Sequence, residues 1–259
     1  MPKLAANLTL LFTELPFLDR FGAARANGFA AVELLFPYDV AVEDIAARLA
    51  QTGLQLVLHN LPAGNWDAGE RGMACDPARI AEFKAGVDLA LAYAIPLGVP
   101  QLHCMAGIVP PGVAPATAHR TYVDNLRYAA GRLAAHGLRL LIEPINTRDM
   151  PGYFLCGSAQ AAAVIAEVGA SNLALQLDLY HLQQMGEDLA AAIRQYAPIT
   201  AHMQLADSPG RHEPGTGEID FAALFALIDG LGYGGWIGCE YRPLHDTVGG
   251  LSWRSALSA

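Results

Sequence analysis

Short apolar runs alternate with longer segments of helical pattern along the whole chain. The segment 159–169 has apolar residues at helical spacing and ends at Gly169, and the segment 17–28 ends at Gly28, a residue type common just after a helix. The apolar runs are nearly continuous, as in strands that are buried on both faces. We expect eight strands, at residues 4–10, 30–36, 54–60, 101–107, 139–145, 173–178, 199–206 and 235–241.

This alternation predicts the fold class. Strands that alternate with helices indicate a parallel sheet, and eight parallel strands can close into a barrel. The length of 259 residues suits one such barrel. We therefore predict an α/β protein with one domain, a single (β/α)8 barrel over residues 1–259. An open, doubly wound sheet is the alternative, but no glycine-rich phosphate-binding sequence follows the first strand.

Four polar residues close successive strand candidates in the second half of the chain. They are Glu143, Asp178, Gln204 and Glu240, at the ends of the runs RLLIE, LALQLD, ITAHMQ and GGWIGCE. The spacing between them suits one strand, one helix and two loops per repeat. Because the carboxyl ends of barrel strands meet at one rim, we expect the four side chains to share a site.

Side-chain alternation within a strand supports this interpretation. Gln204 shares a face with His202, and Asp178 shares one with Gln176. Polar residues on one face of an apolar strand are expected to point into the barrel. A barrel interior also contains polar residues that only satisfy one another, but four consecutive strands with polar ends favour a shared site.

The residue types indicate a metal. Two Glu, one Asp and one Gln offer only oxygen ligands, which suit Mg²⁺ or Mn²⁺ better than Zn²⁺. Three carboxylates close together could not all stay ionised without a cation. We therefore expect a divalent metal, Mg²⁺ or Mn²⁺, held by these four residues.

Composition narrows the function classes. The net charge of −9 and the pI near 5.3 disfavour nucleic acid as a partner, because binding phosphates needs clustered Lys and Arg. The only lysines, Lys3 and Lys84, lie at the N-terminus and in a helical segment, so Schiff-base chemistry has no good candidate.

Cysteine spacing and hydropathy bear on the cellular setting. The four cysteines form no CxxC pair, and no basic segment followed by an apolar one opens the chain, so we expect a cytoplasmic protein with reduced thiols. The uncharged stretch between Leu89 and Ala118 contains five prolines, which is unlike a membrane-spanning helix. It is expected to contain a helix end, a short buried strand and a loop. The oligomeric state stays open, with a homo-oligomer as one outcome.

Several segments resemble one enzyme family over nearly the whole chain. They are ANLTLLFTELPF, VELLFPYD, LHNLPAGNWDAGERG, IEPIN, QLDLYHLQ, HEPGTGEIDF and GWIGCEYRP. These segments resemble the hydroxypyruvate isomerase family of sugar-isomerase-like barrels, a group with the xylose-isomerase-like fold. The start of the chain and the segment QLHCMAGIVPPG also resemble a close branch that isomerises four-carbon 2-oxo-tetronates.

The resemblance implies a reaction and roles for residues. The reaction is isomerisation of hydroxypyruvate, a small 2-oxo acid, to 2-hydroxy-3-oxopropanoate (tartronate semialdehyde), with Glu143 and Glu240 as the acid/base pair. A proton moves between adjacent carbons, and an enediolate stabilised by the metal is the natural intermediate. Asp178 and Gln204 would act as metal ligands without transferring protons.

Other candidates are expected to contact the substrate. His181 follows Asp178 by three residues, a spacing at which similar sugar epimerases place a histidine that contacts the substrate, although a capping or packing histidine is the alternative. Arg71 and Arg211 lie in loops and are candidates for binding the substrate carboxylate, although each could be an ordinary surface arginine. His59 falls in the third strand and either faces the barrel mouth or is a satisfied core histidine.

Three alternative functions remain to be weighed. A DNA-repair endonuclease of this superfamily would have His where Gln204 stands, and it would need a basic groove. A ketose 3-epimerase fits Asp149, six residues after Glu143, but also has His in place of Gln204. A non-catalytic binding barrel would not need both glutamates and a complete ligand set.

Overall fold

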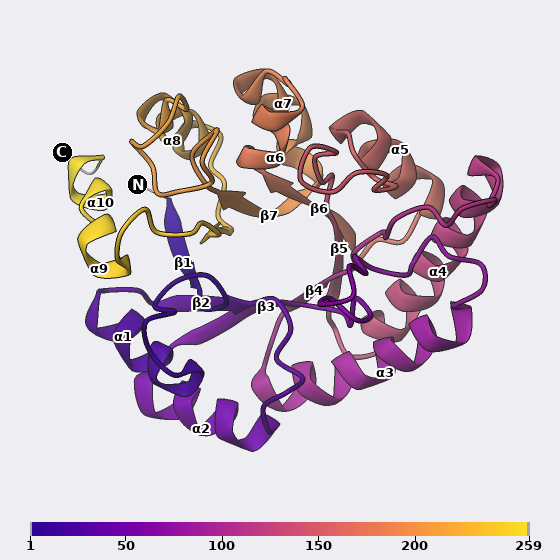
Figure 1. The fold of residues 1–259 in the computed structure, drawn as a ribbon, viewed down its shortest axis with the longest axis horizontal. Helices are drawn as coiled ribbons and strands as arrows, with labels where there is room; N and C mark the ends of the chain where they lie inside the picture. The colour runs from indigo at the N-terminus through magenta and orange to yellow at the C-terminus, as the bar shows by residue number, and fades with distance from the viewer. Residues whose placement is uncertain (1, 258–259) are drawn as a thin grey trace.

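The computed structural model describes residues 2–257, which form a closed barrel of parallel strands (Figure 1). The strands follow one another around the barrel in sequence order, and β8 pairs with β1 to close it. Their bounds are β1 (Lys3–Asn7), β2 (Ala31–Leu34), β3 (Gln55–Asn60), β4 (Gln101–His103), β5 (Arg139–Ile142), β6 (Leu173–Asp178), β7 (Thr200–Leu205) and β8 (Trp236–Cys239). Each lies within a predicted run or overlaps it, so the predicted (β/α)8 barrel is confirmed.

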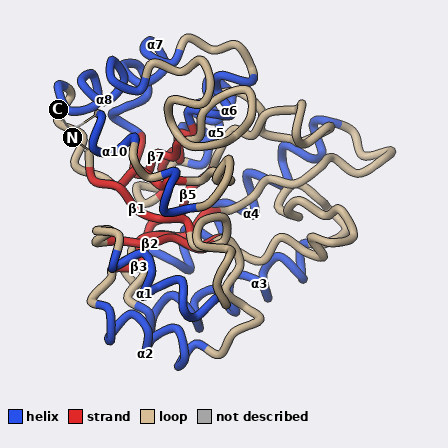
Figure 2. The backbone as a smooth tube through the Cα atoms, turned by 60° about the vertical axis from the view of Figure 1, so that its left-hand side comes forward, coloured by secondary structure: helices blue, strands red, loops and turns tan. Residues whose placement is uncertain are grey.

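Helices surround the strands and shield the outer face of the barrel (Figure 2). Gly169, with φ of 70°, follows α5, and Gly28, with φ of 79°, follows the cap residue of α1, so both predicted helix ends are confirmed. The helices are α1 (Arg20–Ala26), α2 (Val42–Thr52), α3 (Ile80–Leu97), α4 (Pro115–Ala134), α5 (Ser158–Val168), α6 (Leu179–Gln184), α7 (Leu189–Tyr196), α8 (Phe221–Gly230), α9 (Thr247–Gly250) and α10 (Trp253–Ala256), with short 3₁₀ helices at Phe17–Asp19 and Ala197–Ile199.

The uncharged segment divides as the sequence predicts. It contains the end of α3, the buried strand β4 and the loop before α4. Within residues 2–257, no helix is both long and apolar enough to cross a membrane.

The barrel interior changes from apolar to polar towards the rim. Ala5, Ala31 and Leu141 belong to a small buried apolar cluster, and Trp236 packs against it. This cluster lies before the carboxyl ends of the strands. Glu143 comes two residues after Leu141, and Glu240 comes four residues after Trp236. Each glutamate therefore lies on the same face of its strand as the earlier residue. The apolar layer therefore supports the polar residues at the carboxyl ends of the strands.

A buried carboxylate occupies the middle of this interior. Glu33 of β2 is fully buried and contacts Asn7 of β1 at 2.9 Å and both Gln204 and His202 of β7 at 2.7 Å. Both β7 residues reach one carboxylate, so the predicted shared face of His202 and Gln204 is confirmed. Gly238 of β8 makes room for this carboxylate, because a Cβ there would lie 2.2 Å from Glu33 Oε2.

The C-terminal segment closes the ring of helices beside β1. The Thr247 hydroxyl accepts a hydrogen bond from the backbone of Phe12 at 2.7 Å and donates one to Glu14 at 3.1 Å. Arg254 donates to the carbonyl of Asn27 at 2.8 Å. These contacts attach the last helices to the first βα unit.

The close approach at Gly238 predicts the effect of a single methyl group. We expect Gly238→Ala to lower the free energy of unfolding by about 1–3 kcal/mol, because Glu33 is held by its three partners and cannot move away without breaking them. Gly131→Ala, within α4 and with open space around its Cβ, should instead stabilise the protein by up to about 1 kcal/mol. Urea unfolding of both variants measures this, and equal effects of the two substitutions would contradict the packing described.

Candidate active site

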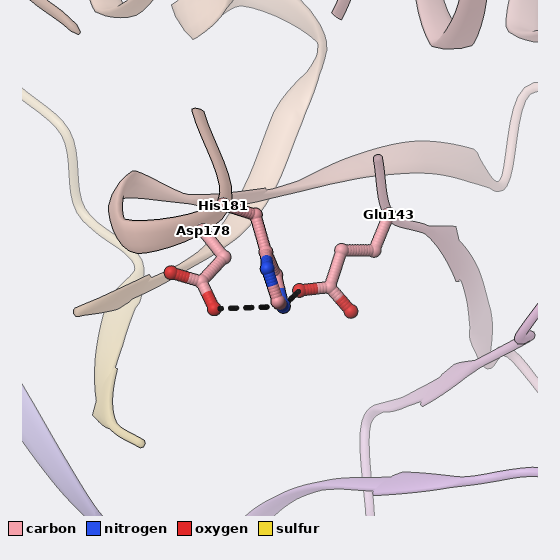
Figure 3. Close-up of side chains that lie close together, drawn as sticks. All are labelled: Glu143, Asp178 and His181. Carbon is pink, nitrogen blue, oxygen red and sulfur yellow. Dashed lines mark ion pairs between the residues drawn. The ribbon is translucent and has the colours of Figure 1, made fainter. Parts of the chain in front are cut away.

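Three acidic side chains meet where β5, β6 and β8 end. Asp178 is the last residue of β6, while Glu143 and Glu240 directly follow β5 and β8. All three side chains are buried. Ligand atoms of Glu143, Asp178 and His181 lie within 4.8 Å of one another, and the His181 ring reaches between the two carboxylates (Figure 3).

Burial and mutual repulsion oppose ionisation of these carboxyl groups. Burial raises the pKa of Glu143 well above its usual range, and the charges of Asp178 and Glu240 raise it further. Burial also raises the pKa of Asp178 to about 6 and that of Glu240 to about 8, although nearby Arg211 partly offsets both shifts. Glu143 Oε1 and Asp178 Oδ2 are buried without a hydrogen-bond partner among the described residues. The group therefore favours the approach of a cation.

Arg211 supplies positive charge to this group from the loop after β7. Its Nη2 lies 2.9 Å from Glu240 Oε1 and 3.9 Å from Asp178 Oδ2. Burial alone would lower the pKa of Arg211, but these carboxylates outweigh burial and raise it. The loop is held by Asp207, which accepts hydrogen bonds from the backbone of Ser208, Gly215, Gly217 and Ile219.

The tautomer of His181 follows from its neighbours. Asn146 Oδ1 accepts hydrogen bonds from two backbone amides, those of Arg148 and Asp149, so its Nδ2 faces His181 Nδ1 at 2.6 Å. Nδ1 must then accept this hydrogen bond, which leaves the ring proton on Nε2. Burial lowers the pKa of His181 well below its usual value, so the ring is neutral. His181 thus presents an N–H donor to the carboxylates, 3.6 Å from Asp178 and 3.9 Å from Glu143, and not a lone pair for a metal.

A second neutral histidine lies on the other side of Glu143. His103 Nε2 is 3.5 Å from Glu143 Oε2, and its Nδ1 is 3.2 Å from Asn60 Oδ1. Burial, together with the charge of His202, lowers the pKa of His103 to about 3. The ring therefore stays uncharged at neutral pH.

A cavity of about 160 Å³ opens beside these groups. Six of its fifteen lining residues are apolar and nine are polar or charged, so the cavity combines an apolar wall with many polar groups that can bind a small polar molecule. It is lined by Thr9, Leu10, Leu35, Asn60, Trp66, His103, Met105, Glu143, Ile145, Met150, Gln176, His181, Arg211, Glu240 and Arg242.

The structure places the predicted site residues at different depths. Glu143, Glu240, His181 and Arg211 line the cavity, and Asp178 lies against them. Gln204 does not line the cavity: it lies below the rim, where its amide contacts Glu33 and Gln176.

Two other predicted residues lie away from the cavity lining. Arg71 packs on the ring of Trp66, 4.0 Å from its centroid, and donates to the carbonyls of Trp66 and Glu70. His59 is buried against Tyr38, with Nδ1 3.3 Å from the Tyr38 hydroxyl. The geometry gives neither residue a direct contact with a small molecule in this cavity.

Two residues that line the cavity were given no role from the sequence, Arg242 and Gln176. Arg242 follows Glu240 by two residues, and its guanidinium forms no ion pair with any residue between 2 and 257. Gln176 precedes Asp178 by two residues, and its Oε1 has no partner within the same part of the chain. The strand periodicity did place Gln176 on the inward face with Asp178, but it assigned Gln176 no role, whereas the direction of Arg242 depends on the loop after β8.

The carboxylate group fits a divalent metal. Glu143 and Asp178 provide buried oxygens without partners, and both carboxyl groups have raised pKa values that a nearby cation would lower. Oxygen donors of this kind suit Mg²⁺ or Mn²⁺.

Comparison with known proteins agrees with this geometry. A family model described as a xylose isomerase-like TIM barrel matches residues 21–256. The chain belongs to this family. Its membership also confirms the xylose-isomerase-like fold class predicted from the sequence.

Full-length relatives within this family have isomerase names. A protein of Cupriavidus necator named 2-oxo-tetronate isomerase is 48% identical over 98% of this chain and 97% of its own length. A protein of Escherichia coli named hydroxypyruvate isomerase is 47% identical over 98% of both chains. The resemblance to hydroxypyruvate isomerases is therefore confirmed, and with it the prediction of an enzyme of the isomerase type.

Solved structures show the same architecture. A crystal structure from Brucella melitensis, named AP endonuclease, family 2, superposes with a TM-score of 0.96 at 46% identity and covers 99% of both chains. A 3-keto-D-glucoside 4-epimerase from Escherichia coli superposes with a TM-score of 0.82 at 22% identity, covering 99% of this chain and all of its own, which shows the shared fold alone.

The raised pKa of Glu143 predicts a pH-dependent gain from neutralising it. The pKa of Glu143 in the folded protein lies above its ordinary value of 4.5. The protonated group therefore contributes its full stability below pH 4.5, and this contribution is lost as the pH rises through the folded-state pKa. Since glutamine cannot ionise, we expect metal-free Glu143→Gln to exceed the wild type in free energy of unfolding at pH 8 by about 1 kcal/mol or more, and by less at pH 5.

Urea unfolding in the presence of a chelator measures this difference. Glu218→Gln is the matched control, because Glu218 is exposed and its side chain makes no hydrogen bond or ion pair within the described residues. A stability difference for Glu143→Gln that does not grow with pH would show that Glu143 is not under electrostatic strain.

Proposed function

We propose that this protein interconverts hydroxypyruvate and 2-hydroxy-3-oxopropanoate by proton transfer between adjacent carbons. The observation that carries the proposal is the pair of buried glutamates, Glu143 and Glu240, which reach one cavity from the ends of β5 and β8. Both have raised pKa values, which bring their proton affinity towards that needed for acid/base catalysis near neutral pH.

The reaction requires two proton movements. One glutamate removes a proton from C3 of hydroxypyruvate, and a proton is returned to C2 by a glutamate, so C3 becomes the aldehyde carbon and C2 carries the new hydroxyl group. The second proton moves between the oxygens: the C3 hydroxyl gives up its proton, and the oxygen on C2 takes one up, so there is no net gain or loss. His181 Nε2–H is placed to donate a hydrogen bond to a substrate oxygen, because its tautomer is fixed by Asn146.

Glu143, Asp178, Gln204 and Glu240 would hold the metal, Mg²⁺ or Mn²⁺. Bound there, the ion would polarise the substrate carbonyl and stabilise negative charge on the substrate oxygens. Asp178 and Gln204 would act only as ligands. The glutamates must keep one oxygen each for proton transfer.

The substrate carboxylate needs a positive partner at the cavity. Arg211 lines the cavity but is already paired with Glu240. Arg242 lines it with an uncommitted guanidinium, so we infer that Arg242 receives the substrate carboxylate, with Arg211 nearby. Arg71 and His59 stay sequence predictions without geometric support.

A four-carbon 2-oxo-tetronate is the alternative substrate. Relatives with either name match this chain almost equally, at 48% and 47% identity. Both candidates are small acids carrying the same 2-oxo group.

We propose a small-molecule enzyme of the cytoplasm that has no nucleic-acid or membrane partner.

Turnover of the two acids tests the proposed function. We expect the purified protein, stripped with a chelator and reloaded with Mg²⁺ or Mn²⁺, to isomerise at least one of them and to lose activity again on chelation. Comparing kcat/KM decides between the two substrates. Turnover of free ketohexoses, but of neither acid, would assign the protein to another activity.

Substitution of each glutamate tests the mechanism. We expect Glu143→Gln and Glu240→Gln each to lower kcat by about 10²-fold or more, since a general acid or base typically contributes that much. Exposed Glu218→Gln should keep wild-type kcat. Substantial turnover by either active-site variant would rule out the two-glutamate mechanism.

Loss of Arg242 should affect binding more than chemistry. We expect Arg242→Gln to raise KM for the acid substrate about tenfold or more with little change in kcat, because a charged hydrogen bond to a carboxylate contributes equally before and during the reaction. Arg120→Gln, on the exposed surface of α4, is the matched control. An unchanged KM in steady-state kinetics would exclude Arg242 from carboxylate binding.

A further inference from the structure

A chain of hydrogen bonds runs from the barrel interior to the cavity. Glu33 Oε1 contacts Gln204 Nε2 at 2.7 Å, and Gln204 Oε1 contacts Gln176 Nε2 at 2.6 Å. Gln176 lines the cavity, whereas Glu33 and Gln204 lie below it and are fully buried. Of these three residues, Gln204 alone has a role in the reaction described above.

The direction of this chain is set at Glu33. The backbone amide of Thr9 donates to Asn7 Oδ1, so Asn7 must present its Nδ2 to Glu33 Oε1, at 2.9 Å. Glu33 Oε1 is therefore an acceptor, whichever partner holds the proton between Glu33 Oε2 and His202. The amide of Gln204 must then turn its nitrogen towards Glu33 and its oxygen away from it.

The same direction passes on to Gln176. Because Gln204 offers its oxygen, Gln176 must turn its nitrogen inward, and its own oxygen is left over. Gln176 Oε1 is buried and has no hydrogen-bond partner within residues 2–257. A buried amide oxygen without a partner costs free energy unless a ligand supplies a donor.

We propose that Glu33 is a positioning residue that fixes both glutamine amides, so that Gln204 Oε1 is directed to the divalent metal and Gln176 Oε1 accepts a hydrogen bond from a substrate hydroxyl. This inference rests on the proposed function, because it names how the same site holds its metal and substrate. An amide oxygen has two lone pairs, so Gln204 Oε1 can accept from Gln176 and still ligate an ion. The neutral Gln176 oxygen suits the hydroxyl on C3 of hydroxypyruvate without adding charge to an acidic site.

Two substitutions of similar size separate orientation from packing. Glu33→Met removes the acceptor, so the amide of Gln204 is free to turn. We expect the Kd of this variant for Mn²⁺ to rise about 10- to 100-fold, as is typical when a residue that orients a metal ligand is lost. Glu33→Gln keeps an oxygen for Asn7 and Gln204 and can donate its own amide to His202, so we expect a Kd within about threefold of the wild type. Titration calorimetry with Mn²⁺ measures both without relying on turnover.

The outcomes are distinct. Folded Glu33→Met with wild-type Mn²⁺ affinity overturns the positioning role, and so does an equal loss in Glu33→Gln. If the wild type binds Mn²⁺ but isomerises neither acid, the proposed function fails while the Mn²⁺ comparison still decides the role of Glu33.

A second variant tests the outer end of the chain of hydrogen bonds. Gln176→Leu leaves Glu33 and Gln204 in contact, so we expect Mn²⁺ affinity within about threefold of the wild type and a KM for the acid substrate raised about tenfold. If Glu33→Met does not fold, this variant still decides whether the outer amide of the chain binds the substrate. An unchanged KM in Gln176→Leu would overturn the assignment of its oxygen to the substrate.

Discussion

Repulsion between buried carboxylates is the constraint on which this structure depends. Glu143, Asp178 and Glu240 are brought together by the closure of the barrel, and burial makes each more costly to ionise. In the protein alone, Arg211 offsets part of that charge through its contact with Glu240. The charge that Arg211 does not offset favours the approach of a cation and raises the proton affinity of both glutamates.

The polar groups nearest the three carboxylates add no further negative charge, although the more distant charge of Glu33 raises the pKa of each of them. His103 and His181 are held neutral by burial, and His181 offers a donor because Asn146 occupies its other nitrogen. A further carboxylate, Glu33, lies deeper in the barrel but is surrounded by donors. The site therefore combines a group of mutually repelling acids with a layer of hydrogen bonds around Glu33 beneath it.

Sequence periodicity could predict the barrel and the rim, because both depend on local patterns. Strand alternation and helix ends are written into consecutive residues, and Glu143, Asp178 and Glu240 follow from the rule that barrel strands end at one rim. The contacts of Gln204 with Glu33 could not be predicted in this way, because they join strands far apart in the chain. Arg71 and His59 show the same limit, because their contacts with the aromatic residues Trp66 and Tyr38 depend on how the chain folds and are not visible in the local pattern.

The attachment of the last helices to the first βα unit has a consequence for how the protein comes into being. Glu240 comes after Glu143 and Asp178 in the sequence, and Thr247, which contacts Phe12 and Glu14, comes later still, so both are synthesised after the other acidic residues of the site. A growing chain thus exposes an unpaired edge of β1 until β8 emerges. The three carboxylates come together only when that edge is covered, so a nascent chain does not carry their mutual repulsion before its fold is closed.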